Sequence, residues 1–227
     1  MPQTTLQNII NDKTAFLPPL INQIQPVNQR GPTCGLYALT NLYRPLTGLL
    51  DWQATAGANL GGASLRKHAK QMGATHLGEI FDVKDMKRIS ESMGLAAEIV
   101  KVENNFDMFV SGIIINNIFI LIPFSNQNGD PGFLGDRPHW ALIIGANPTT
   151  HHIYATHWGK FWKWTTLSIV RSNYCIRDWV NSKWEKTGSG LRYRQVSLRY
   201  LWRKGYTFNT PLSQTLAKQC VLIRYRK

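Results

Sequence analysis

The residue types best suited to nucleophilic chemistry occur in residues 29–39, where a cysteine follows a tight turn. Apolar side chains recur at helical spacing behind Cys34, and Thr33 is a good helix cap, so we expect Cys34 in the first turn of a helix. The free backbone N–H groups and the helix dipole there favour a thiolate. Gln29 lies upstream, where its amide and the Cys34 N–H can hold an oxyanion. The alternative is that Cys34 is an inert core residue.

A histidine provides the second chemical element. His139 opens an apolar run, residues 139–145, directly after a polar loop. A side chain at the start of a buried strand can face a cleft while the strand stays in the core. Its imidazole can take the proton of a thiol and later return one to a leaving amine. The alternative is a loop histidine without a catalytic role, but together His139 and Cys34 favour a thiolate–imidazolium pair.

A third group is expected to orient the imidazole through its other ring nitrogen, usually from the next strand. That strand ends in Thr156-His157-Trp158-Gly159 and offers no Asp, Asn or Glu. Thr156, His157, a water or a backbone carbonyl are the candidates that the sequence leaves open.

Metal and cofactor sites are not expected. His151 and His152 are adjacent, so in a strand they point to opposite faces, and no pair of cysteines shows ligand spacing. The sequence also lacks a glycine-rich loop of the kind that cradles phosphates. We therefore predict neither a structural zinc nor a bound cofactor.

Periodicity divides the chain into a helical part and a strand-rich part. The order of helices first and antiparallel strands second predicts an α+β fold. Helices are expected over residues 51–60, 64–72, 82–94 and 105–110, and strands over residues 97–102, 113–123, 139–145 and 152–156.

The composition fits one sizeable globular domain of 227 residues. The three cysteines are odd in number and widely spaced, so a disulfide framework is not expected and a reducing compartment is. The N-terminus has no signal-peptide pattern, and no run of about 18 apolar residues occurs. These features predict a cytoplasmic protein that does not enter a membrane, or one that is delivered into a host cytosol.

The charge is strongly basic, with 26 Lys and Arg against 13 Asp and Glu, a net charge of +13. Most of the excess lies from Lys183 onward, where the chain has 11 basic residues and one acidic residue, Glu185. Such a field attracts an acidic polypeptide, a nucleic acid or an anionic membrane. The aromatic residues there are interleaved with Arg and Lys, which keeps nucleic acid open as a partner. A solvated basic face without a specific partner is the other alternative.

Several blocks of the sequence resemble the actin maturation proteases, a family of papain-like cysteine peptidases. The blocks occur in the family's order: Gln29-x-Gly31-Pro32-Thr33-Cys34-Gly35-Leu36, then Gly78-Glu79-Ile80-Phe81 with Asp85-Met86, then Leu121-Ile122-Pro123-Phe124 with His139-Trp140-Ala141, and then Gly159-Lys160-Phe161-Trp162 with Arg171-Ser172-Asn173.

The resemblance implies a papain-like fold, with a helical lobe that carries the cysteine packed on an antiparallel sheet that carries the histidine. It implies that the acetylated N-terminal residue of actin is removed, with Cys34 as nucleophile, His139 as base and acid, and Gln29 as oxyanion donor. We expect an extended arm over residues 1–27 and a peptidase domain over residues 28–227, of which 183–227 form a basic extension of the sheet.

The acidic N-terminus of actin agrees with the basic charge of the chain. Arg30 stands beside Gln29 and Arg137 beside His139, where charge-assisted hydrogen bonds can hold an acidic peptide. Two alternatives stay open: a cysteine peptidase effector or toxin with another host protein as target, and a basic binding module with little turnover on the same fold.

Overall fold

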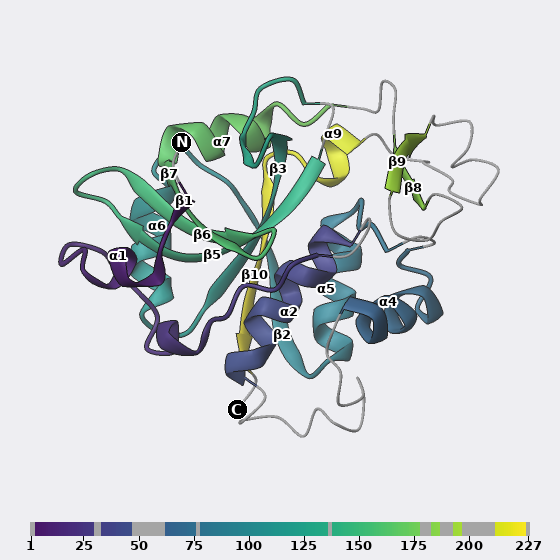
Figure 1. Ribbon diagram of the computed structural model, residues 1–227, viewed down its shortest axis with the longest axis horizontal. Helices are drawn as coiled ribbons and strands as arrows, with labels where there is room; N and C mark the ends of the chain where they lie inside the picture. The colour runs from purple at the N-terminus through teal and green to yellow at the C-terminus, as the bar shows by residue number, and fades with distance from the viewer. Residues whose placement is uncertain are drawn as a thin grey trace.

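A single antiparallel sheet of eight strands organises the chain (Figure 1). The computed structural model describes residues 3–29, 33–46, 62–75, 78–135, 138–177, 183–186, 193–196 and 212–225. The sheet has the order β1-β7-β6-β5-β3-β10-β2, and β4 pairs with β3. Its strands are β1 (Gln3–Thr4), β2 (Leu95–Lys101), β3 (Phe119–Gln127), β4 (Asp130–Pro131), β5 (Pro138–Asn147), β6 (His152–His157), β7 (Lys160–Thr165) and β10 (Gln219–Tyr225). Two further strands, β8 (Lys183–Lys186) and β9 (Tyr193–Val196), pair with each other.

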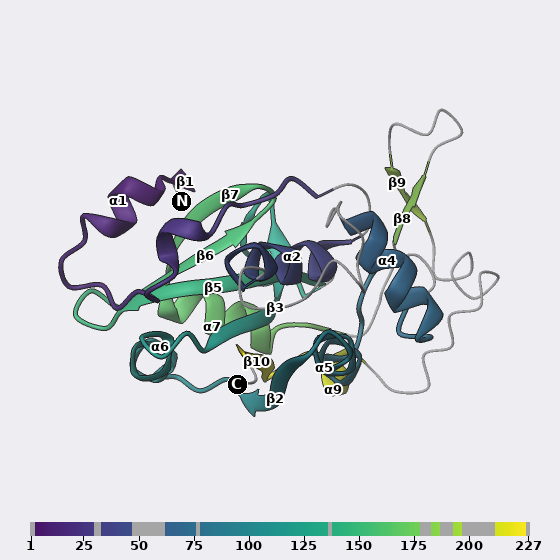
Figure 2. The same cartoon turned by 90° about the horizontal axis from the view of Figure 1, so that it is seen from below.

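Helices cover both sides of the central strands. Figure 2 shows α2 on one side of β5 and β3, and α6 and α7 on the other. The helices are α1 (Leu6–Ile10), α2 (Cys34–Leu46), α4 (Gly62–Gln71), α5 (Val83–Ser92), α6 (Phe106–Ile114), α7 (Thr166–Tyr174) and α9 (Leu212–Thr215). The α+β class with an antiparallel sheet is therefore confirmed.

The central strands are buried along almost their whole length because helices lie on both faces. In β5, every residue after Pro138 is buried, and in β3 the first seven residues are buried. This explains why both strands are continuous apolar runs without the alternation of a half-exposed strand. The predicted hairpin of β5 and β6 is present, joined through residues 148–151.

One predicted element was wrong. The apolar run from Ile113 to Pro123 was expected to be one strand, but α6 continues to Ile114 and β3 begins only at Phe119. A turn with Asn117 at a φ of 54° separates them. Short β-branched runs do not distinguish a buried helix end from a strand, which explains the error. The helix expected over residues 51–60 lies outside the described residues.

The N-terminal residues 3–29 run along the sheet. β1 pairs with β7 at the edge, and Phe16 forms an isolated bridge with Ala146 of β5. The Asp12 carboxylate accepts hydrogen bonds from the Asn147 side chain and from the Tyr154 hydroxyl. This part of the chain is thereby attached to the β5–β6 hairpin. Among the helices in the described residues, none has the length and apolar character needed to cross a membrane.

Candidate functional site

Cys34 is the first residue of α2, as the helix signals predicted. Thr33 is buried before it, and the Thr33 carbonyl accepts the Tyr37 N–H at 2.9 Å in the first turn. The Cys34 side chain is half-buried and packs against the edge of the hydrophobic core. The thiol therefore lies at the end of a helix where backbone N–H groups and the dipole favour negative charge.

His139 is the second residue of β5 and lies directly across from Phe124 of β3. Only 7% of its surface is exposed. Burial, and secondarily the neighbouring His157, hold the pKa of His139 well below its usual value. Burial therefore favours the neutral imidazole over the imidazolium.

The residues next to Cys34 and His139 are in contact with each other. A Cβ placed on Gly35 would lie 3.1 Å from Cδ1 of Trp140, so the Trp140 indole packs on the α2 backbone at this point. The indole also donates its Nε1–H to the Ile80 carbonyl at 2.9 Å. Consecutive Cα atoms are about 3.8 Å apart, so this contact brings the start of α2 to the start of β5.

Gln29 belongs to a segment that reaches the same end of the sheet. The Asn41 side chain of α2 accepts the Val27 N–H at 2.9 Å. Asn28 packs so closely on Gly159, between β6 and β7, that a Cβ there would collide with it. The residue before Gln29 and the residue after Trp158 are thus neighbours.

The turn between β6 and β7 contains a bulky residue, Trp158, in a left-handed backbone conformation. Trp158 and Gly159 have φ angles of 49° and 68°, the left-handed values of a tight hairpin turn. Glycine adopts this conformation freely, whereas a bulky side chain is strained in it. The strained backbone directs the Trp158 indole onto two histidine rings, with centroids 5.3 Å from His139 and 5.2 Å from His157.

The two side chains considered for orienting His139 have different surroundings. The Thr156 hydroxyl accepts a hydrogen bond from the Asn41 side chain at 3.2 Å and so faces α2. The His157 ring lies beside His139, with ring centroids 5.1 Å apart and planes at 71°. His157 is 3% exposed, and burial is the first cause of a pKa lowered to about 3.

Several predicted features fall outside what the structure describes. Arg30 and Arg137 lie outside the described residues, so their roles stay predictions. Within the described ranges, no group of three or more His, Cys, Asp or Glu side chains is placed to hold a metal ion. The interpretation of the sequence missed Asn41 and the contact of Trp158 with the two histidine rings. A large aromatic residue directly before a turn glycine was the available signal for Trp158.

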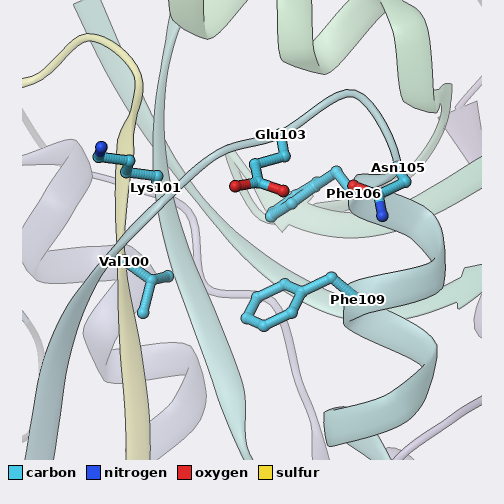
Figure 3. A pocket seen from close by; sticks show the side chains of 6 residues that line it. All are labelled: Val100, Lys101, Glu103, Asn105, Phe106 and Phe109. Carbon is cyan, nitrogen blue, oxygen red and sulfur yellow. The ribbon is translucent and has the colours of Figure 1, made fainter.

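A pocket of about 300 Å³ lies elsewhere, between the end of β2 and the start of α6 (Figure 3). Phe106 and Phe109 form its apolar side, and their rings stack at 6.2 Å. Lys101, Glu103 and Asn105 supply polar groups at its border. None of the predicted site residues lines this pocket.

The described geometry defines an α+β protein with a cysteine at a helix start and a buried histidine at the start of a neighbouring strand. A model of the family described as actin maturation protease-like, C-terminal domain, matches residues 24–147. This match covers more than half of the chain, and the chain therefore belongs to the actin maturation protease-like family. No curated protein sequence matches it. Membership in this family indicates, in general terms, a peptidase.

Proposed function

We propose that the chain is a papain-like cysteine peptidase in which Cys34 is the nucleophile and His139 the general base and acid. One observation carries this proposal: the family match spans both residues, and their neighbours Gly35 and Trp140 are in direct contact. The position of Cys34 at a helix start supports it, because the backbone N–H groups and the helix dipole there favour a thiolate.

The position of His139 in β5 determines from which side the Cys34 thiol can reach its imidazole. Alternate residues of a strand point to opposite faces, and Trp140 is the residue that faces α2. His139 packs against Phe124 and is the second residue of β5, close to the end where this strand begins. The proposal requires the Cys34 thiol to reach the imidazole around the end of β5, because Trp140 occupies the face toward α2.

The reaction follows from these groups. The Cys34 thiol transfers its proton to His139, and the thiolate forms a bond to the carbonyl carbon of the peptide bond. The Gln29 amide and the Cys34 backbone N–H stabilise the oxyanion. The imidazolium then protonates the leaving amine as the C–N bond breaks. A water that gives its proton to His139 hydrolyses the thioester and restores the thiol.

The proposed substrate is the acetylated N-terminus of actin or of an actin-like protein with an acidic segment behind its first residue. The family match supports an actin-related substrate, and the net charge of +13 supports an acidic one. Arg30 directly follows Gln29, and Arg137 lies two residues before His139, and these two arginines are our candidates for holding the carboxylates.

The test is mass spectrometry of immature actin, with its acetylated first residue intact, after incubation with the protein. We expect the wild-type chain and a Cys175→Ser variant to remove that residue, and Cys34→Ala to leave it in place. Cys175 is a matched control because it is also a half-buried free cysteine, located outside the proposed site.

Two other outcomes would change the proposal. Equal cleavage by Cys34→Ala would exclude Cys34 as nucleophile. Intact actin in every sample, combined with cleavage of other N-termini in a proteome-wide screen, would keep the peptidase and replace the substrate. No cleavage in either assay would favour a binding module.

A further inference from the structure

Two histidine ring nitrogens at the candidate site, like the nearby Nε1 of Trp164, are buried without a hydrogen-bond partner among the described residues. They are Nε2 of His139 and Nδ1 of His157, and they belong to neighbouring rings. A buried polar atom without a partner is costly, and such atoms in a folded protein often have a functional reason. We therefore looked for one interaction that would satisfy both histidine nitrogens.

The protonation state of His157 is fixed by its surroundings. Its Nε2 lies 2.8 Å from the Gly129 carbonyl oxygen, which can only accept, so Nε2 carries the proton. The Trp162 indole stacks on the ring at 4.7 Å and holds its orientation. Because burial keeps the ring neutral, Nδ1 of His157 is left as an unprotonated acceptor.

The distance between the two histidines suits a hydrogen bond between them. An N–H···N bond of about 2.9 Å brings two imidazole centres to about 5 Å, and the centroids are 5.1 Å apart. We propose that His157 is the positioning residue of the candidate site: its Nδ1 accepts the Nε2–H of His139, which leaves Nδ1 of His139 to take the Cys34 proton. The two nitrogens are not bonded to each other in this structure, so the proposal requires the His139 ring to rotate.

This inference rests on the proposed peptidase function and extends it. A neutral acceptor fixes the tautomer and the direction of the base, as the carboxylate or amide does in other triads. It stabilises the imidazolium less than a carboxylate would, because it carries no charge. Thr156 does not compete for this role, since its hydroxyl already binds Asn41 on the α2 side.

Kinetics with three variants test the inference. His157→Phe keeps an aromatic ring but removes the acceptor, and His157→Asn places an amide oxygen near the former Nδ1. His152→Phe is the matched control, because it makes the same change on the same strand away from His139. We expect His157→Phe to lower kcat at least about tenfold with KM little changed. We expect His157→Asn to recover much of the loss and His152→Phe to match the wild type.

Nuclear magnetic resonance of the imidazole nitrogens tests the same bond without a substrate. In the wild-type chain His139 should carry its proton on Nε2, and in His157→Phe both tautomers should be populated. A His139 ring protonated on Nδ1 in the wild type, or an unchanged tautomer in His157→Phe, would overturn the inference. So would a His157→Phe variant that is folded and cleaves at the wild-type rate.

The two readouts separate the inference from the proposed function. If the wild-type chain cleaves nothing but shows the expected tautomers, the peptidase proposal fails and the histidine pair stands. If it cleaves and the tautomers do not respond to His157, the peptidase stands and the positioning role fails.

Discussion

Gly35 of α2 lies against the indole of Trp140 with no room for a side chain between them. A Cβ on Gly35 would come within 2.7 Å of the Met86 Cε and 3.1 Å of the Trp140 Cδ1. The Met86 methyl can move, but the indole is held by its hydrogen bond to Ile80. This contact sets the separation of the candidate nucleophile helix from the strand that carries the candidate base.

Gly35→Ala should therefore separate α2 from β5. We expect a loss of about 1–3 kcal/mol in the free energy of unfolding, the usual cost of overpacking, together with reduced cleavage. Gly112→Ala is the control, since Gly112 lies in α6 with nothing near its missing side chain, and there alanine should stabilise by about 0.5–1 kcal/mol. Urea denaturation measures both. Equal effects of the two changes would contradict the close packing at Gly35.

The buried imidazole of His157 should make the protein less stable in acid. Burial comes first in lowering its pKa to about 3, Lys160 acts in the same direction, and the Gly129 hydrogen bond opposes them. Between pH 6.5 and pH 3 the unfolded chain binds a proton that the folded chain does not, so stability falls as the pH falls.

The His157→Asn variant measures this contribution. Its free energy of unfolding should depend less steeply on pH between 6.5 and 3 than that of the wild type. A slope unchanged by His157→Asn would mean that folding does not lower the pKa of His157.

Asp12 should affect the stability of the protein at a lower pH than His157 does. Desolvation raises the pKa of its carboxyl, but hydrogen bonds from Tyr154, Asn147 and Thr14 outweigh it and lower the pKa to about 2. Stability from Asp12 is present above pH 3.8 and is lost as the pH falls through 2. Asp12→Asn should remove this part of the acid transition, as followed by circular dichroism from pH 5 to pH 1.5. If Asp12→Asn unfolded in acid in the same way as the wild type, the hydrogen bonds to the Asp12 carboxylate would not contribute to stability.

Asn41 should matter for stability because its side chain connects three segments. It is buried in α2, donates to Thr156 of β6 and accepts from Val27. Asn41→Ala leaves buried partners unsatisfied and should cost about 1–3 kcal/mol. Gln7→Ala removes an exposed side-chain hydrogen bond in α1 and should stay within about 0.5 kcal/mol of the wild type. Similar losses in the two variants would contradict the role given to Asn41.

The cysteines should differ in reactivity. Cys220 lies fully buried in β10, and burial raises the pKa of its thiol well above the usual range. Cys34 at the helix start should be alkylated first by iodoacetamide near pH 7, Cys175 later, and Cys220 only after unfolding. Peptide mapping over time gives the order. Alkylation of Cys175 ahead of Cys34 would weaken the case for an activated thiol.

The elements around the candidate residues could be predicted from local signals. Thr33 and the apolar spacing behind Cys34 located the start of α2, and the polar loop before His139 located β5. Asp82 capped α5 as expected, with its carboxylate accepting the Lys84 N–H. These features depend on residues close in sequence, and a sequence pattern records such relationships directly.

Relationships between distant segments could not be predicted in the same way. The contact of Trp158 with both histidines depends on the register of β5 and β6 and on a left-handed turn at a tryptophan. The choice between Thr156 and His157 depends on which face of β6 meets α2. Two adjacent residues of a strand face opposite sides, so a shift of one position would have exchanged them.

The place of β10 has a consequence for how the protein is made. β2 and β3 follow each other along the chain with only α6 between them, yet β10 lies between the two and pairs with both. Until the ribosome has released residues 219–225, β2 has no neighbour in the sheet. The nascent chain must hold an open gap in its apolar layer while β4 to α9 are synthesised, which exposes strand edges that attract other chains. Chaperone binding to the nascent chain should fall once β10 fills the gap.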